Sequence, residues 1–271
     1  MKTGIQRTLA LVLALLTLLA CAVLPASAAS GVKVTVDGRN VSFNSNLGSP
    51  YINENGRTMV PFRAVANFMD GVKVNWFADR RIAEFSKEEV PYNSSGGQVA
   101  SFWVSVEFPI GTNQVWLWVR TYRADGSQYA AYSRFTQMDT LSTVRNGRTY
   151  APIRYLAENL CYTVGWNNSS RTATLTSPSG DWAKAFVQAE NKKGYDHIVS
   201  DDYVARQYVY FYARWCYGDM NPNVSYLGTD VMQSGTHIWK FKYNTKGDYL
   251  YITQDGKTFY STDGGTSYKQ F

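Results

Sequence analysis

The sequence predicts an α+β fold in which a strand-helix-strand-strand unit with an antiparallel sheet occurs twice and is followed by a smaller α+β module. The phrase NGRTMVPFRAVANFM at residues 55–69 returns as NGRTYAPIRYLAENL at residues 146–160, and such an internal repeat indicates one supersecondary unit used twice. Each copy contains one amphipathic helical pattern next to short strands. After residue 180 the pattern changes to two helices and an antiparallel meander.

The first copy shows how each element of the unit follows from its residues. Asn55-Gly56 predicts a tight turn because both residues tolerate positive φ, and the short strand RTMV follows. Pro61 suits the first turn of a helix, where its missing N–H costs nothing. The stretches VKVNW and RIAEF are then strands joined by a polar turn. The apolar helix face is Phe62, Val65, Ala66 and Met69 in this copy and Ile153, Leu156, Ala157 and Leu160 in the other.

The residues that both copies share are interpreted as architectural. Arg63 and Arg154 stand in the first helical turn, where the helix dipole disfavours a cation. Each is either an anion-binding arginine or a structural arginine tied to a carboxylate or to strand carbonyls of its own unit. Because both occupy the same framework position, the structural role is favoured. The shared structural set is Gly56, Arg57, Pro61, Arg63 and Trp76 with Gly147, Arg148, Pro152, Arg154 and Trp166.

The segment between the copies contains the candidate ligand-binding face. Alternating side chains predict strands at residues 103–108 and 115–122, and Asp125-Gly126 folds the chain back toward Phe135. Aromatic rows with a polar neighbour can stack on sugar rings or peptide, since they bring large contact area at little entropy cost. The alternative is that both faces of these strands are buried. The candidate face consists of Trp116, Trp118, Arg120, Tyr122 and Tyr129.

Residues 181–271 are expected to form a separate α+β module. A helix is predicted from Asp181 to Lys193, and Ser200-Asp201-Asp202 can start a second one. A strand remains the alternative there, because tyrosines alternate at residues 208–212. The stretches THIWKFKYN, DYLYIT and KTFYS then predict the meander. The last turn, STDGGTSY at residues 261–268, resembles an Asp-box, with a plain Asp-Gly-Gly turn as the alternative.

The N-terminus predicts export. Residues 1–28 combine a positive start, an apolar run too short to span a membrane, and a small-residue cleavage site ending at Ala28. The stretch LLAC is a competing lipoprotein box that would anchor the chain at Cys21. Removing Lys2 and Arg7 lowers the formal net charge from +6 to +4. This mildly basic charge favours binding to an anionic envelope polymer and is much lower than is typical of nucleic-acid-binding proteins. No other segment approaches membrane-spanning length.

Two cysteines remain after the expected cleavage, Cys161 and Cys216. In an exported chain they can form one disulfide or remain two thiols, and the sequence leaves both open. Cys216 with His237 is also conceivable as a thiol nucleophile and its base, which is a remote alternative because no signature surrounds it. The chain contains no paired-carboxylate motif, nucleophile elbow or phosphate loop.

The pattern N-G-R-T-x-x-P-x-R-x-x-A, followed by V-x-W and a closing strand, resembles the copper amine oxidase N-terminal-like domain, a stalk domain of many secreted Gram-positive bacterial proteins. The resemblance covers residues 32–177, with copies at about 32–86 and 114–176. It implies a non-catalytic appendage. It does not imply copper, because His197 and His237 are the chain's two histidines and lie outside the matching region. We therefore expect no cofactor and no metal.

Together these features predict a secreted, non-enzymatic protein of the cell envelope. Its expected partner is cell-wall polysaccharide or a surface protein, bound through aromatic stacking and modest positive charge. The alternative is a structural spacer or protein-interaction domain that binds no glycan. Nucleic acid is not an expected partner.

Overall fold

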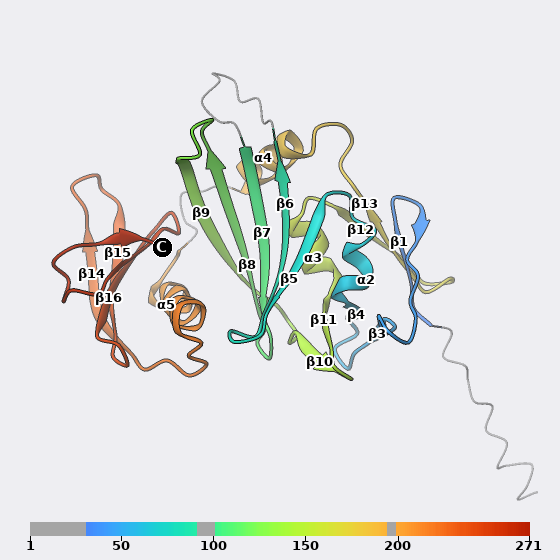
Figure 1. Cartoon of the computed structure of the whole chain (residues 1–271), viewed down its shortest axis with the longest axis horizontal. Coiled ribbons are helices and arrows are strands. Elements are labelled where there is room, and N and C mark those ends of the chain that lie inside the picture. Colours follow the sequence, from blue (N-terminus) through green and yellow to red (C-terminus); the bar gives the residue numbers. More distant parts are fainter. Residues whose placement is uncertain (1–30, 91–100, 194–198) are drawn as a thin grey trace, which may run out of the picture.

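The computed structural model describes residues 31–90, 101–193 and 199–271. The expected signal peptide, the Cys21 alternative and His197 lie outside these residues. Layers follow one another along the longest axis, from the C-terminal sheet through helix α5 (Asp202–Tyr217) and a central sheet to helices α2 (Phe62–Ala66) and α3 (Ile153–Asn159) and two small sheets (Figure 1). The mixture of helices and mostly antiparallel sheets confirms the predicted α+β class.

Each copy of the repeated unit contains a strand, a short helix and a two-stranded hairpin. The proline of each copy ends the strand and caps the helix, with φ −67° at Pro61 and −63° at Pro152, and does not lie in the first helical turn as expected. Cys161, at φ 64°, takes the left-handed position that Gly71 takes after α2. The elements are β4 (Thr58–Pro61), α2, β5 (Val72–Phe77) and β6 (Ile82–Glu89), then β11 (Arg148–Pro152), α3, β12 (Thr163–Asn167) and β13 (Thr172–Thr176).

The two copies meet at the antiparallel pair of β4 and β11. Pro61 lies opposite Tyr150 and Pro152 lies opposite Met59, so the end of each strand lies beside the start of the other. The sheet order is β10-β11-β4-β3, with β10 (Thr143–Arg145) and β3 (Tyr51–Ile52) outside. The pairing therefore brings the helix start of one copy close to the Asn-Gly-Arg-Thr turn of the other.

The hairpins of the two copies enter different sheets. β5 and β6 form one side of the central sheet, whereas β12 and β13 join β1 (Lys33–Val36) and β2 (Arg39–Asn40). In that small sheet β1 runs parallel to β13, because the strands come from distant parts of the chain and need no hairpin.

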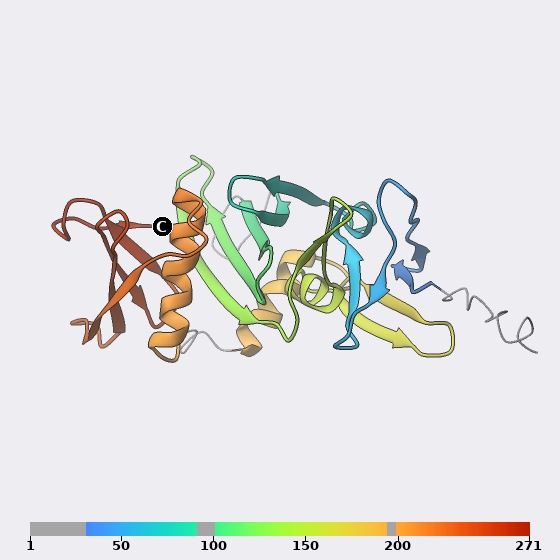
Figure 2. The ribbon, with the colours of Figure 1, turned by 90° about the horizontal axis from the view of Figure 1, so that it is seen from below.

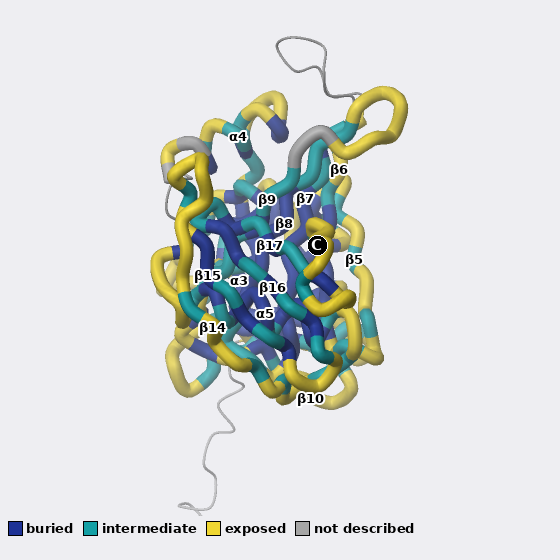
Figure 3. Tube along the Cα trace, turned by 90° about the vertical axis from the view of Figure 1, so that its left-hand side faces the viewer, coloured by how far each residue is buried: buried dark blue, intermediate teal, exposed yellow. Residues whose placement is uncertain are grey.

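The central sheet has the order β5-β6-β7-β8-β9 and is covered on both faces. Val106 and Leu117 face a core shared with α2 and α3, whereas Trp116 and Trp118 face a second core shared with α5. Figure 3 shows these buried segments at the centre of the layers and exposed loops around them. The added strands are β7 (Ser101–Pro109), β8 (Gln114–Tyr122) and β9 (Gln128–Gln137).

Helix α4 (Trp182–Lys193) packs on the repeat region, although the sequence grouped residues 181–193 with the C-terminal module. The Trp182 ring lies 5.8 Å from that of Phe102, and its Nε1 donates to the Leu160 carbonyl at 2.9 Å. Arg134 of β9 donates to Asn159 of α3 at 3.0 Å and to the buried Glu190 of α4 at 3.2 Å. The core of the repeat region therefore extends beyond residue 177.

The C-terminal part consists of α5 and a five-stranded antiparallel meander. The Asp201 carboxylate accepts from the Val204 N–H at 2.9 Å and Gly218 ends the helix at φ 67°, so the helix and not the alternative strand forms here. The helix stands between the meander and the central sheet (Figure 2). The strands are β14 (Val224–Val231), β15 (His237–Tyr243), β16 (Asp248–Thr253), β17 (Thr258–Ser261) and β18 (Lys269–Gln270), paired in that order.

Arg214 fastens α5 to the central sheet. Its guanidinium donates to the carbonyls of Arg80 at 2.7 Å, Arg81 at 3.2 Å and Ile110 at 3.0 Å. Burial lowers the pKa of Arg214 to about 10, because the ion gives up much of its hydration in this contact. Within the part of the chain that the structure describes, no helix is both long and apolar enough to cross a membrane.

Candidate functional site

The aromatic face expected to bind a ligand is covered by α5, which corrects the prediction. Trp116 is fully buried and Trp118 is 6% exposed. The Trp116 ring lies 4.6 Å from Phe211 and 4.7 Å from Tyr208, and the Trp118 ring lies 5.6 Å from Phe271. A residue with no solvent contact cannot stack on a sugar ring. The structure therefore shows the alternative interpretation, in which both faces of these strands are buried.

The remaining members of that face do not form a binding surface with the tryptophans. Arg120 is half-buried and its guanidinium lies over the rings of Trp103 at 4.8 Å and Trp118 at 5.6 Å. Tyr122 is half-buried in β8. Tyr129 lies in β9, and its side chain is outside the described part of the structure. Arg120 thus stacks on aromatic rings of the interface with the C-terminal part.

The cysteines are not joined by a disulfide. Cys161 lies just after α3 and packs against the core of the repeat region, whereas Cys216 lies in α5. Cys216 is partly exposed, but its neighbours desolvate the thiol enough to raise its pKa to about 11. The charges that act on this thiol come from Arg80 and Asp248, and His237 is not among them. A nucleophilic cysteine needs a lowered pKa, so the remote thiol-enzyme alternative has no support here.

The described residues contain no group of three or more His, Cys, Asp and Glu side chains that could hold a metal ion. Two concave surfaces lie beside the repeated phrase. We call them the first and the second groove.

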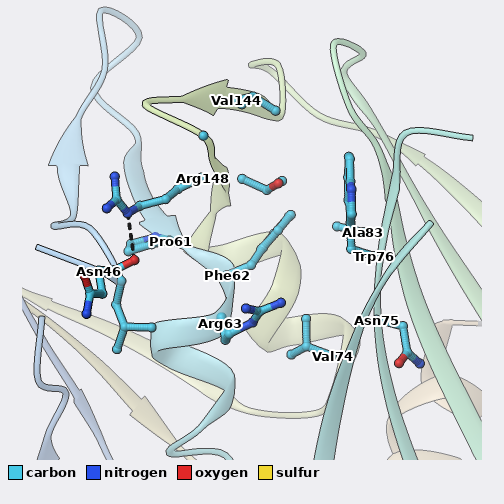
Figure 4. Close-up of a pocket in the computed structure, with 13 residues that line it drawn as sticks. Asn46, Pro61, Phe62, Arg63, Val74, Asn75, Trp76, Ala83, Val144 and Arg148 are labelled. Carbon is cyan, nitrogen blue, oxygen red and sulfur yellow. Dashed lines mark hydrogen bonds between the residues drawn. The ribbon is translucent and has the colours of Figure 1, made fainter. Parts of the chain in front are cut away.

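The first groove is a hollow of about 300 Å³ beside α2. In Figure 4 Trp76 stands on the β5 hairpin on one side, and Arg148 of the other copy stands on the opposite side. The α2 residues Phe62 and Arg63 lie between them (Figure 4). Its lining is Asn46, Leu47, Pro61, Phe62, Arg63, Val74, Asn75, Trp76, Ala83, Val144, Gly147, Arg148 and Thr149.

An aromatic and a cationic side chain of the first groove are exposed. Trp76 is 42% exposed, and Arg63 is exposed. The Arg63 guanidinium makes no hydrogen bond or ion pair with the residues that the structure describes. The structural interpretation of Arg63 as tied to a carboxylate or a carbonyl is therefore wrong, and its positive charge faces the solvent of the groove.

Arg148 in the same groove does have a structural role. Its Nε donates to the Asn46 carbonyl at 2.9 Å, Nη1 donates to the Asn146 carbonyl at 2.9 Å, and Nη2 donates to the Ser45 carbonyl. These bonds hold residues 45–46 against the second copy and fix the wall of the groove. Carbonyls do not cancel the charge of Arg148, so it adds to the positive field beside Arg63.

The second groove, of about 890 Å³, lies beside α3. Trp166 is 40% exposed, and its Nε1 donates to Asn168 at 2.6 Å. Arg154 is 62% exposed and lies 3.6 Å from Glu158, one helical turn away. Arg57 donates from Nε to Asp139 at 2.7 Å, which holds the pKa of that carboxyl below its usual range. The charged lining is Arg57, Arg154, Arg171 and Asp139.

The two grooves are equivalent positions of the repeat. Each is formed by the proline, the arginine and the hairpin of one copy together with the Gly-Arg-Thr turn of the other. Gly147 has φ 71° and Gly56 has φ 70°, so both turns have the same conformation. The matching residues are Pro61, Phe62, Arg63, Val74, Trp76, Ala83, Gly147, Arg148 and Thr149 with Pro152, Ile153, Arg154, Val164, Trp166, Ala173, Gly56, Arg57 and Thr58.

Sequence reasoning found these residues but assigned them the wrong environment. Trp76 shares a face of β5 with Val72 and Val74, which pack on the core, so the alternation predicts a packed indole. Six residues of strand span about 20 Å, whereas the five residues of α2 span about 7.5 Å. The helix is too short to cover the whole strand, so the indole at the far end overhangs it.

Comparison with protein families supports the architectural part of the prediction. The family described as the copper amine oxidase N-terminal domain matches residues 35–175. Comparisons with curated proteins and with solved structures give no match. The matched region spans both copies of the phrase, both grooves and all five strands of the central sheet. Because it covers just over half of the 271 residues, the protein belongs to the copper amine oxidase N-terminal domain family.

Proposed function

We propose that this protein is an exported, non-catalytic module that binds an anionic cell-wall glycan in the two grooves of its duplicated unit. The copper amine oxidase N-terminal domain is a non-catalytic domain, which supports the absence of catalysis over residues 35–175. Export follows from the signal peptide expected at residues 1–28. The wall is the compartment in which an exported, mildly basic module meets acidic polymer.

The observation that carries the proposal is the exposed tryptophan beside an arginine in both grooves. An indole buries about 250 Å² when fully covered, so the exposed two fifths of Trp76 leave about 100 Å² of mostly apolar surface in water. Covering it is worth about 2.5 kcal/mol. A sugar ring is flat enough to cover an indole face, and an exposed indole in a concave site is the usual platform for such stacking.

The charges of the grooves select an acidic ligand. The lining of the first groove contains Arg63 and Arg148 and no carboxylate. The lining of the second contains three arginines and one aspartate, Asp139, which is already paired with Arg57. Guanidinium groups bind carboxylate and phosphate in bidentate geometry, and both occur on wall polymers. Stacking and ion pairing can therefore act on the same sugar unit.

A sedimentation assay tests the proposal. Residues 29–271 are mixed with insoluble peptidoglycan that carries its attached anionic polymers, and with the same material after those polymers are stripped. We expect the unmodified chain to sediment with the first material. The double variant Trp76→Ala with Trp166→Ala should bind at least about tenfold more weakly. Each substitution removes roughly half or more of a contact worth about 2.5 kcal/mol, and about 1.4 kcal/mol corresponds to tenfold in affinity.

The matched control is Tyr203→Ala, which removes an aromatic side chain that is 55% exposed on α5, outside both grooves. It should sediment like the unmodified chain. Loss of binding on stripped material assigns the ligand to the anionic polymers, and retained binding assigns it to peptidoglycan. If the chain sediments with neither material and captures a surface protein instead, it is a protein-interaction domain and the proposal is wrong.

A further inference from the structure

We infer that the protein is bivalent and that its two grooves bind two separate segments of acidic polysaccharide, so that one chain bridges them. This inference rests on the proposed function, because it assigns the same ligand class to both grooves. It goes further in the number of sites and in what they do together.

The first step is the position of the grooves. The first contains Pro61 at the end of β4 and the turn that starts β11, whereas the second contains Pro152 at the end of β11 and the turn that starts β4. β4 and β11 run antiparallel and lie side by side. The grooves therefore lie at opposite ends of this strand pair, and binding in one leaves the other open.

The second step is that both grooves hold the same recognition groups. Trp76 and Trp166 are exposed to nearly the same extent, 42% and 40%. Each lies with an exposed helix arginine, Arg63 or Arg154, and with the anchored arginine of the opposite turn. A ligand unit that satisfies the first groove therefore finds the same residue types in the second, where Arg57 and Arg154 also have Asp139 and Glu158 as neighbours.

The third step is that the groove frameworks do not depend on a ligand. Arg148 is held by three backbone carbonyls, and Arg57 is held by Asp139, so one wall of each groove is fixed by bonds within the chain. The exposed Trp76 and Arg63 contribute to neither core cluster. Removing the recognition groups of one groove should therefore leave the fold and the other groove intact.

Isothermal titration with a short acidic oligosaccharide released from the wall polymer counts the sites. The unmodified chain should bind two molecules, Trp76→Ala one, Trp166→Ala one, and the double variant none above background. A bridging assay follows, in which beads coated with the polymer bind the protein and then recruit soluble labelled polymer. Each single variant should still bind the beads but lose at least about tenfold in recruitment.

The outcomes separate this inference from the proposed function. One binding site in the unmodified chain, or undiminished recruitment by both single variants, overturns bivalency and leaves glycan binding standing. No binding of the oligosaccharide or the beads by the unmodified chain overturns the proposed function and bivalency together. The far-UV circular dichroism spectrum of each variant, including the control Tyr203→Ala, must match that of the unmodified chain, so that a loss of binding is not a loss of folding.

Discussion

A buried carboxylate in the central sheet should make the stability of this protein fall as pH rises. Glu107 of β7 is 4% exposed and lies opposite Glu84 of β6. The Ser105 hydroxyl lies 3.1 Å from Glu84 and 3.3 Å from Glu107, and its single proton can serve one of them at a time. Burial first, and then the charge of Glu84, raise the pKa of Glu107 to about 8, although Arg120 opposes this.

The sign and size of the effect follow from proton linkage. The folded protein keeps the proton on Glu107, whereas the unfolded chain releases it once the pH exceeds the ordinary value of 4.5. The contribution of Glu107 to stability is therefore greatest below pH 4.5, falls as pH rises through this window, and levels off above about pH 8. At about 1.4 kcal/mol per pH unit, the full window corresponds to about 5 kcal/mol.

Glu107→Gln tests this reasoning. The amide oxygen can still accept a hydrogen bond from Ser105, but the side chain cannot ionise. The folded variant therefore no longer has to keep a carboxyl group protonated above pH 4.5. The variant should equal the unmodified chain near pH 4.5 and exceed its free energy of unfolding by up to about 5 kcal/mol near pH 8. Urea unfolding followed by far-UV circular dichroism at several pH values measures this difference. Contributions from other ionisable groups cancel because both proteins contain them.

Glu88→Gln, an exposed substitution on the neighbouring strand β6, is the matched control and should follow the unmodified chain at every pH. Parallel stability curves for Glu107→Gln and the unmodified chain between pH 4.5 and 8 would refute the argument. That result would mean that Glu107 is ionised inside the fold.

The remaining predictions concern the stability of the interface between the central sheet and the C-terminal part, and of the last turn of the chain. Trp116→Ala should lower the free energy of unfolding by about 3–5 kcal/mol in urea titrations, because it leaves a cavity among buried aromatic rings, whereas Trp76→Ala should lower it by less than about 1 kcal/mol. Arg214→Met should cost about 2–4 kcal/mol in the same assay, because three carbonyls lose their donor. Asp263 accepts from the Ser261 and Ser267 hydroxyls, which lowers its pKa, so Asp263→Ala should lower Tm at pH 7 and speed amide exchange in the turn.

Local features of the fold could be predicted from the sequence because short-range chemistry determines them. Asp201 begins α5 with a side-chain cap and Gly218 ends it, and both signals are readable without a structure. The turn predicted at residues 261–268 is held by Asp263, which accepts from the N–H groups of Thr266 and Ser267 at 3.0 Å. These interactions join residues only a few positions apart.

Long-range packing could not be predicted in the same way. Strand periodicity groups Trp116 and Trp118 on one face, but it does not say whether solvent or another element lies above them. That element is α5, more than eighty residues later in the chain, and its Phe211 is one of many apolar residues that could have covered the face. The same limit explains α4, whose Trp182 packs on Phe102 instead of on the C-terminal part that follows it.

The exposed groups of the grooves also bear on how strongly the protein can bind. A contact worth about 2.5 kcal/mol at Trp76, with an exposed ion pair adding at most about 1 kcal/mol, gives one groove only weak affinity for a single sugar unit. A polymer presents the same unit many times, and a second groove on the same rigid framework meets it at an effective concentration in the millimolar range. With a single-groove Kd of about 3 mM, that effective concentration lets two grooves hold a polymer a few times more tightly than one. Under the proposed function, duplication of the unit thus partly compensates for helices too short to enclose a deep pocket.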